Sequence, residues 1–272
     1  MNSAADAAAN ATAPIALGVA GAAGRMGKAV LELASADEQL KLTAAIDAPG
    51  RSGAAAAQTA IELASADAID WRQLAVLIDF SLPAGAAAHA ARAAEAGCAL
   101  VIGTTGLDAE QTKAVDAAAE QVALLHAPNM SLGVGILFRL VAQAARMLPE
   151  WDAEILELHH RAKVDAPSGT ARRLGQIVQQ LRPGSQFCTD RSGRRQARPD
   201  NEIGYAVLRG GDAIGEHTAL FAGRGERIEL THRSTSRLTY AAGAIAAAKY
   251  LIGKKPGRYN MDDLLDELAG GG

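Results

Sequence analysis

The chain has 272 residues, of which 49% are hydrophobic, and it carries a formal net charge of −3 and two cysteines. This length suggests one large or two ordinary domains, the small negative charge gives no reason to expect nucleic acid or an anionic membrane as partner, and no apolar stretch approaches the roughly 20 residues that span a bilayer. Cys98 and Cys188 form neither a disulfide framework nor a metal-ligand pattern, so we expect no metal and a reducing, cytoplasmic location.

The chain begins with a polar extension that leads into an apolar strand and a glycine turn. Residues 1–14 are rich in Ala, Asn, Ser and Thr and lack the features of a secretory signal, so we expect a disordered extension. The predicted strand 15–20 is followed by Gly21-Ala-Ala-Gly-Arg-Met-Gly27 and a helix over 25–36. Glycine lets the backbone turn sharply and approach a diphosphate, and the helix N-terminus then faces that anion. The pattern predicts a dinucleotide site, although a tight turn without a ligand would use similar residues.

The second predicted strand, 40–46, ends in Asp47. A carboxylate at the end of the second strand, about twenty residues after the glycines, suits the hydroxyls of an adenosine ribose. Residues 48–68 are rich in Ala and small polar residues, and they indicate a variable excursion before the next strand.

Three more strands are expected over 75–80, 99–102 and 122–126, alternating with helices over 83–97 and 108–121. This alternation predicts parallel pairing with right-handed crossovers, and therefore an N-terminal Rossmann-type doubly wound sheet of the α/β class. The carboxyl ends of such strands form the ligand crevice. The polar loops at these ends are Asp79-Phe80-Ser81, Gly103-Thr104-Thr105-Gly106 and Ala127-Pro128-Asn129-Met130-Ser131. The second loop suits a nicotinamide ribose, or it is an ordinary turn capped by threonine.

The pattern changes after Asn129. A long apolar helix over 133–147 precedes a strand over 152–159 with one solvated face, and Ser168 stands at the N-cap position of a helix over 170–181. Few helical residues separate the later strands, which predicts a C-terminal α+β domain with a mostly antiparallel sheet. In this half we expect a loop over 182–200, strands over 206–209, 213–222 and 226–233, and helices over 239–251 and 261–268.

The densest polar cluster of the chain is Glu157–Thr170. It contains the adjacent His159 and His160, Lys163, and the helix start Ser168-Gly169-Thr170. Histidine carries protons near neutral pH, lysine is a compact cation, and a helix start binds anions. The cluster therefore predicts a site that holds a small dianion and delivers protons to it. The alternative is a solvated basic loop whose histidines only pack.

Three other features of the sequence are less informative. Five arginines lie between Arg182 and Arg198 without interleaved aromatic residues, which favours a solvated loop over a nucleic-acid surface. Arg237 precedes a helix, where it either reaches a carboxylate or lies on the surface. Neither cysteine has a basic neighbour in sequence that would make it a nucleophile.

Taken together, these motifs resemble the 4-hydroxy-tetrahydrodipicolinate reductase family, also called dihydrodipicolinate reductases. The resemblance spans nearly the whole chain from Ile15, and its most specific part is the run His-His-x-x-Lys-x-Asp-x-Pro-Ser-Gly-Thr at 159–170. It implies reduction of 4-hydroxy-tetrahydrodipicolinate to tetrahydrodipicolinate with NAD(P)H, in the diaminopimelate and lysine pathway. It further implies a homotetramer, a dinucleotide-binding domain formed by residues 15–130 and 241–272, and a substrate-binding and tetramerisation domain formed by residues 131–240.

The resemblance also implies roles for single residues. His159 would be the proton donor and acceptor and Lys163 a proton donor, because a hydride added to the substrate ring must be balanced by a proton. The residues implied in substrate binding are His160, Ser168, Gly169, Thr170 and Arg237. The residues implied in cofactor binding are Gly21, Ala22, Ala23, Gly24, Arg25, Met26, Asp47, Gly103, Thr104, Thr105, Ala127, Pro128, Asn129 and Met130.

One position departs from the family pattern. Many members have a basic residue directly after the acid of the second strand, where it meets a 2′-phosphate, whereas Ala48 follows Asp47 here. This favours NADH over NADPH, while Arg25 and Arg51 leave dual use open. Two other functions also stay open: a related Rossmann oxidoreductase with another substrate, and a dinucleotide sensor without turnover. A sensor has no need of the proton donors at His159 and Lys163.

Overall fold

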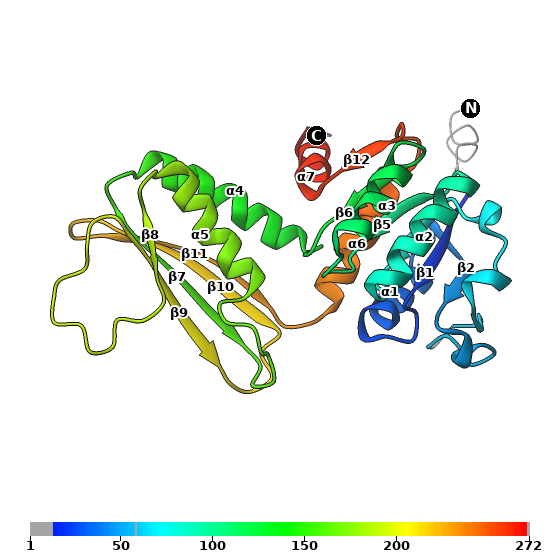
Figure 1. Cartoon of the computed structure of the whole chain (residues 1–272), viewed down its shortest axis with the longest axis horizontal. Coiled ribbons are helices and arrows are strands. Elements are labelled where there is room, and N and C mark those ends of the chain that lie inside the picture. Colours follow the sequence, from blue (N-terminus) through cyan, green and yellow to red (C-terminus); the bar gives the residue numbers. More distant parts are fainter. Residues whose placement is uncertain (1–12, 58, 271–272) are drawn as a thin grey trace, which may run out of the picture. The chain divides into compact units, whose positions relative to one another are not determined.

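The computed structural model describes residues 13–57 and 59–270, and it divides into two compact units (Figure 1). The first unit comprises the described residues of Met1–Pro128 and Tyr240–Gly272, and the second unit is Asn129–Thr239. The disordered extension expected over residues 1–14 lies outside the described residues except for its last two. No helix in the described part of the chain has the length and apolar character needed to cross a membrane.

The first unit is built on a parallel sheet whose central strands are covered on both faces. Its strands are β1 (Ile15–Ala20), β2 (Leu40–Ile46), β3 (Leu63–Ala64), β4 (Val76–Asp79), β5 (Ala99–Ile102), β6 (Ala123–His126) and β12 (Gly257–Tyr259). They lie in the order β12-β6-β5-β4-β1-β2-β3, and their pairings are parallel. Every residue of β4 and β5 is buried, as expected for strands between two helical layers. The predicted doubly wound sheet is therefore confirmed.

Two of the helix ends in the first unit carry caps that the sequence supplies. The residue after α2 is Gly97, whose φ of 70° gives the left-handed turn that closes the helix, and Asp108 forms a capping box with Gln111 at the start of α3. An ion pair of 2.6 Å between Lys249 and Asp37 ties α6 to this unit. The helices are α1 (Arg25–Ser35), α2 (Pro83–Ala96), α3 (Ala109–Ala119), α6 (Leu238–Leu251) and α7 (Met261–Gly270), with 3₁₀ turns at Pro49–Arg51, Ala66–Ala68 and Trp71–Gln73.

The second unit is a mixed sheet with two helices on one of its faces (Figure 1). Its strands are β7 (Asp152–His159), β8 (Gln186–Cys188), β9 (Glu202–Arg209), β10 (Gly215–Ala222) and β11 (Arg227–Ser234), and its helices are α4 (Leu132–Met147) and α5 (Gly169–Leu181). The order is β11-β10-β7-β9-β8. Pairing is antiparallel across β11, β10 and β7, as expected, and β9 and β8 extend the sheet in parallel. The core of this unit lies between the sheet and the two helices.

Three short strands are not predicted from the sequence, and one boundary differs from the prediction by more than two residues. The expected loop over 182–200 contains β8, β9 begins four residues earlier than predicted, and the pattern does not predict β3 or β12. Each of the three missed strands has two or three residues and lies at or next to an edge of its sheet. A segment this short carries no period of its own, so only the neighbouring strand determines that it pairs.

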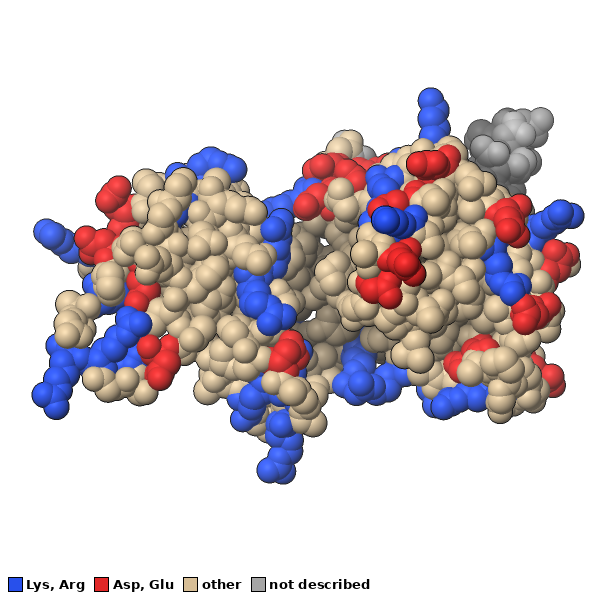
Figure 2. All heavy atoms as spheres, viewed as in Figure 1, with Lys and Arg blue, Asp and Glu red and all other residues tan. Residues whose placement is uncertain are grey.

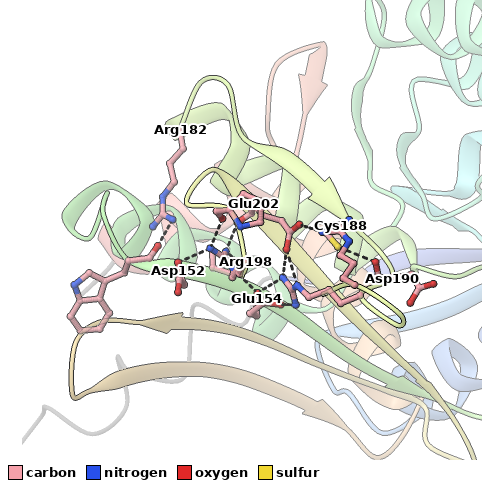
Figure 3. A network of polar contacts seen from close by, with 12 residues as sticks. Asp152, Glu154, Arg182, Cys188, Asp190, Arg198 and Glu202 are labelled. Carbon is pink, nitrogen blue, oxygen red and sulfur yellow. Dashed lines mark hydrogen bonds and ion pairs between the residues drawn. The ribbon is translucent and has the colours of Figure 1, made fainter. Parts of the chain in front are cut away.

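Arginine side chains attach the loop 189–201 to the sheet of the second unit (Figure 3). Arg191 pairs with Glu154 at 2.7 Å and with Glu202 at 2.6 Å. Arg198 pairs with Glu154 at 3.1 Å. The loop is exposed along most of its length, as predicted, but the sequence does not predict these ion pairs, because Glu154 lies 37 and 44 residues away along the chain and is brought close only by the sheet.

Candidate active site

The glycine turn of the first unit packs backbone closely against backbone at positions where other residues would place a side chain. Gly21 has a φ of 71°, and an added Cβ there would lie 2.5 Å from the Phe80 carbonyl oxygen. At Gly27 an added Cβ would lie 2.6 Å from the Ala22 Cα and closer still to the Gly21 carbonyl oxygen. Gly24 is the N-cap of α1 and has no side chain to bind the first N–H groups of that helix. These N–H groups and the positive end of the helix dipole can therefore receive a diphosphate.

Asp47 directly follows β2 and lies against the glycine turn. Its carboxylate accepts hydrogen bonds of 2.8 Å from the N–H groups of Ala23 and Ala48. The guanidinium of Arg51 lies 3.8 Å from the same carboxylate. The structure thus places the acid predicted for the ribose beside the turn predicted for the diphosphate, with a positive charge next to it.

Asp79, at the end of β4, holds the loop that contains Gly103, Thr104 and Thr105. The Thr104 hydroxyl donates to Asp79 at 3.0 Å, as does the Ser81 N–H at 2.7 Å. His89 Nδ1 lies 2.6 Å from the other carboxylate oxygen. Burial alone would raise the pKa of Asp79, but the hydrogen bonds from His89 and Ser81 outweigh it and lower the pKa. The hydroxyl of Thr104 therefore serves the loop itself, whereas Thr105 is exposed.

The segment Ala127–Met130 follows β6 and leads from the first unit into the second. Its two terminal residues are buried. Asn129 donates from Nδ2 to the Thr170 hydroxyl at 3.1 Å and accepts from the Ser131 N–H at 2.9 Å. Asn129, expected to contact the cofactor, is thus fixed beside Thr170, which is expected to contact the substrate.

His159 is the last residue of β7 and stands on the face that the helices cover. The alternation of the strand puts Glu157 on the same face, and both side chains are buried. Glu157 Oε2 lies 2.9 Å from His159 Nδ1. The ring of His217 on β10 is edge-on to the ring of His159, with 5.0 Å between centroids. The predicted proton donor therefore stands between a buried carboxylate and a second buried histidine.

Hydrogen bonds keep the Glu157 carboxylate ionised in spite of its burial. Its Oε1 accepts from the Ser168 N–H at 2.9 Å and from Arg209 at 3.0 Å. Burial by itself would raise the pKa of Glu157, but the hydrogen bonds from His159, Ser168 and Arg209 outweigh it and hold that pKa well below its usual range. Burial and, to a smaller extent, the neighbouring His159 lower the pKa of His217 to about 4, so His217 is neutral at pH 7.

Glu157, His159 and His217 also offer ligand atoms within 4.8 Å of one another, a spacing that a metal ion can use. Oε1 of this carboxylate is already bound to Arg209 and to the Ser168 N–H. These hydrogen bonds account for the buried charge without a metal.

The loop between β7 and α5 carries two further predicted groups. Lys163 forms an ion pair of 2.7 Å with Asp165 and its side chain is 23% exposed. This contact lowers the pKa of Asp165. The backbone N–H of His160 donates to the Ala213 carbonyl at 2.7 Å, which fixes the start of the loop. Lys163 is therefore placed on the same loop as His160, close to the surface.

The start of α5 combines a closed cap with an open first turn. Ser168 is buried, and its Oγ accepts from the Ala171 N–H at 3.2 Å and lies 3.2 Å from His217 Nε2. Gly169 is exposed, and among the described residues no atom lies within 4 Å of a Cβ added to it. The N-terminal turn at Gly169 and Thr170 can therefore receive a carboxylate from solvent, while the Ser168 hydroxyl is already used by the cap and by His217.

Sequence reasoning gave no role to Glu157, Arg209 or His217. Glu157 had a signal, because it lies two residues before His159 on a predicted strand and must share its face. Arg209 had none, since it lies 52 residues from Glu157 along the chain. Arg237 lies half-buried between β11 and α6, and within the described residues no hydrogen bond joins it to the cluster around His159.

The buried neutral His217 predicts that the protein loses stability in mild acid. The pKa of His217 is about 4 in the folded state against an ordinary value of 6.5, so the unfolded chain takes up this proton first. The free energy of unfolding should therefore fall between about pH 6.5 and pH 4, by on the order of 3 kcal/mol for this group. Urea unfolding across this range should show how the free energy of unfolding depends on pH. In His217→Gln the slope of this dependence should correspond to the uptake of about one proton fewer on unfolding. An equal slope in both proteins would contradict the assignment.

Two family models match the chain and together cover most of it. The model described as "Dihydrodipicolinate reductase, N-terminus" matches residues 15–130, and "Dihydrodipicolinate reductase, C-terminus" matches residues 133–265. The 4-hydroxy-tetrahydrodipicolinate reductase of Nitrosomonas europaea is 44% identical over 93% of this chain and 98% of its own length. That of Alkalilimnicola ehrlichii is 45% identical over 92% of this chain and 98% of its own length.

Solved structures share the fold at lower identity. A dipicolinate-bound dihydrodipicolinate reductase from a Paenisporosarcina species has a TM-score of 0.74 at 24% identity, covering 91% of this chain and 97% of its own. A diaminopimelate (DAP) dehydrogenase from C. glutamicum, in complex with DAP, has a TM-score of 0.54 at 13% identity, covering 95% of this chain and 99% of its own. At these identities the likeness establishes the fold and no more.

Proposed function

The chain belongs to the dihydrodipicolinate reductase family, and we propose that it reduces 4-hydroxy-tetrahydrodipicolinate to tetrahydrodipicolinate with NAD(P)H, in the diaminopimelate and lysine pathway. It is an NAD(P)H-dependent oxidoreductase with a Rossmann-like domain. The observation that carries the assignment within the molecule is the loop 159–170, where a histidine, a lysine and an open helix start stand together. A freshly prepared substrate and the absorbance of NADH provide the test, and absence of substrate-dependent NADH or NADPH oxidation would contradict it.

The first unit supplies the cofactor site in this proposal. The residues that would hold the dinucleotide are those of the glycine turn with Asp47 and the loop at Gly103, because they leave backbone N–H groups and a carboxylate at one edge of the sheet. The nicotinamide supplies a hydride when bound. The residues of the chain orient the dinucleotide. Asp79 contributes by accepting the hydrogen bond from Thr104 that fixes the loop at Gly103.

The second unit supplies the substrate site and the protons. The open first turn of α5 and the ammonium group of Lys163 suit the two carboxylates of the substrate. His159 exchanges a proton with the substrate, and Lys163 is the second donor. His160, Ser168 and Arg237 are further proposed substrate contacts, although the Ser168 hydroxyl is already bound to His217.

We further propose that NADH is preferred and NADPH is also accepted. Ala48 stands where many relatives have a base, which favours NADH, while Arg51 offers a positive charge 3.8 Å from Asp47 for a 2′-phosphate. Asp47→Asn keeps an acceptor but removes the charge that repels that phosphate. We expect it to lower the ratio of kcat/KM for NADH to kcat/KM for NADPH by about 10-fold. This factor corresponds to the free energy of one hydrogen bond to a charged group. Arg51→Ala should raise the ratio, and a ratio unchanged in both variants would contradict the proposal.

The sheet of the second unit supports a proposed homotetramer. Leu156, Leu158 and Leu208 point to the face away from the helices, and Leu208 is 55% exposed. An apolar sheet face of this kind is typical of an interface between identical chains. Sedimentation should give the mass of four chains, and a monomer mass at micromolar concentration would contradict this.

The distribution of surface charge and the two free cysteines support the remaining proposals, which concern the partners and the location of the protein. Figure 2 shows acidic and basic side chains interspersed over the visible face of the first unit. This mixture, with a net charge of −3, favours a small-molecule substrate over nucleic acid or a membrane. Cys98 and Cys188 are free and buried, which supports a cytoplasmic location.

A further inference from the structure

We propose that Glu157 is a positioning residue for His159. Its carboxylate accepts a hydrogen bond from the Nδ1–H of the imidazole, fixes the ring and its tautomer, and leaves Nε2 as the nitrogen that exchanges a proton with the substrate. This inference rests on the proposed catalytic role of His159, and it gives a function to a buried charge that the reaction itself does not consume.

The first line of support is that the two carboxylate oxygens of Glu157 have different partners. Oε1 is anchored by the Ser168 N–H and by Arg209, at 2.9 and 3.0 Å. Oε2 and His159 Nδ1 are both buried, neither has another hydrogen-bond partner within the described residues, and they lie 2.9 Å apart. An unsatisfied buried acceptor costs stability, so a proton on Nδ1 satisfies both atoms at once. The hydrogen bond that one ring nitrogen makes determines which of the two nitrogens carries the proton.

The second line of support is the set of residues next to the rest of the His159 ring. His217 lies edge-on at an interplanar angle of 72°. Gly215 passes so close to the ring that an added Cβ would lie 3.0 Å from His159 Nε2. The ring therefore has a carboxylate at Nδ1, while the missing side chain of Gly215 leaves room beside Nε2, and the ring keeps one orientation with Nδ1 towards Glu157.

The same carboxylate also connects His159 to the loop that carries Lys163. Arg209 binds Glu157 and donates to the Asp165 carbonyl at 2.5 Å. Ser168, the N-cap of α5, is held by its N–H to the same oxygen. Removing the whole side chain would therefore disturb the loop as well as the ring, and the isosteric Glu157→Gln is the informative change.

A double-mutant cycle tests the proposal. We expect Glu157→Gln to lower kcat by about 10²-fold, since an amide facing Nδ1 favours the wrong tautomer, and to leave the Kd of NADH unchanged. In the His159→Ala background, Glu157→Gln should cost no further activity. The control is Glu202→Gln, which also removes a buried, arginine-paired carboxylate but lies at the other end of β9 and should leave kcat unchanged.

The outcomes separate the positioning role from the catalytic one. An equal fractional loss from Glu157→Gln in both backgrounds would overturn the positioning role while leaving His159 catalytic. Undiminished turnover of His159→Ala would overturn both. If Glu157→Gln does not fold, ¹⁵N spectra of histidine-labelled wild-type enzyme at neutral pH, with His159 assigned by its absence in His159→Ala, decide the matter. The neutral form of the ring is expected to carry its proton on Nδ1, and a neutral form protonated at Nε2 would overturn the proposal.

Discussion

His159→Ala and Lys163→Ala are each expected to lower kcat by about 10² to 10⁴-fold, the usual contribution of a positioned proton donor. The Kd of NADH should stay nearly unchanged, because both residues belong to the second unit and the predicted dinucleotide site belongs to the first. Steady-state turnover with freshly made substrate, together with fluorescence titration of NADH, measures the two quantities separately. A loss confined to kcat indicates groups that act in the transition state.

A matched control for Lys163 lies two residues away. Arg161 is exposed on the same loop, so Arg161→Ala removes a positive charge without removing the ion pair between Lys163 and Asp165. Its kcat should be close to that of the wild type. Intact turnover in both His159→Ala and Lys163→Ala would contradict the proposed mechanism, and an equal loss in Arg161→Ala would mean that only the charge of the loop matters.

Gly27→Ala is expected to weaken NADH binding by about 100-fold or more and to destabilise the protein by about 1–3 kcal/mol. The added Cβ would lie 2.6 Å from the Ala22 Cα and closer still to the Gly21 carbonyl oxygen. Both are backbone atoms, so no side-chain rotation relieves the overlap, and α1 must move away from the turn. That movement carries its N–H groups away from the diphosphate.

The control for this change is another glycine of the same unit. Gly50 has nothing within 4 Å of an added Cβ among the described residues and no left-handed φ. Gly50→Ala should therefore keep the wild-type Kd of NADH and the wild-type stability. Wild-type affinity in Gly27→Ala, measured by titration and accompanied by thermal unfolding, would exclude the turn as the dinucleotide site.

The elements predicted best are those whose signal lies within their own residues. β1 and β2 have the predicted bounds, and the predicted glycine turn stands between β1 and α1. The helix N-cap at Ser168 is confirmed by its hydrogen bond to the Ala171 N–H. A turn, a cap or a buried run depends on neighbours a few residues away, so the local sequence suffices to specify it.

The elements predicted worst depend on partners that are distant in the chain. β8 and β12 exist because β9 and β6 offer them free edges. The ion pairs of the arginines at 191 and 198 are not predicted because Glu154 is far from them in sequence, yet the sheet places their guanidinium groups against its carboxylate. Charge composition indicates nothing about such pairs, since a pair requires the register of two strands and not the presence of two charges.

The candidate site divides in the same way. The sequence by itself determined the glycine turn, Asp47 and the run from His159 to Thr170, because the turn and the run are each encoded within a few consecutive residues and Asp47 directly follows a strand that its own residues predict. Only the tertiary structure decided that Glu157 faces His159 while Arg209 binds the other carboxylate oxygen of Glu157. It also decided that His217, on the adjacent strand, lies edge-on against the imidazole ring of His159. Those contacts cross three strands, and the register that aligns them is set by packing of the sheet against α4 and α5, which no local pattern contains.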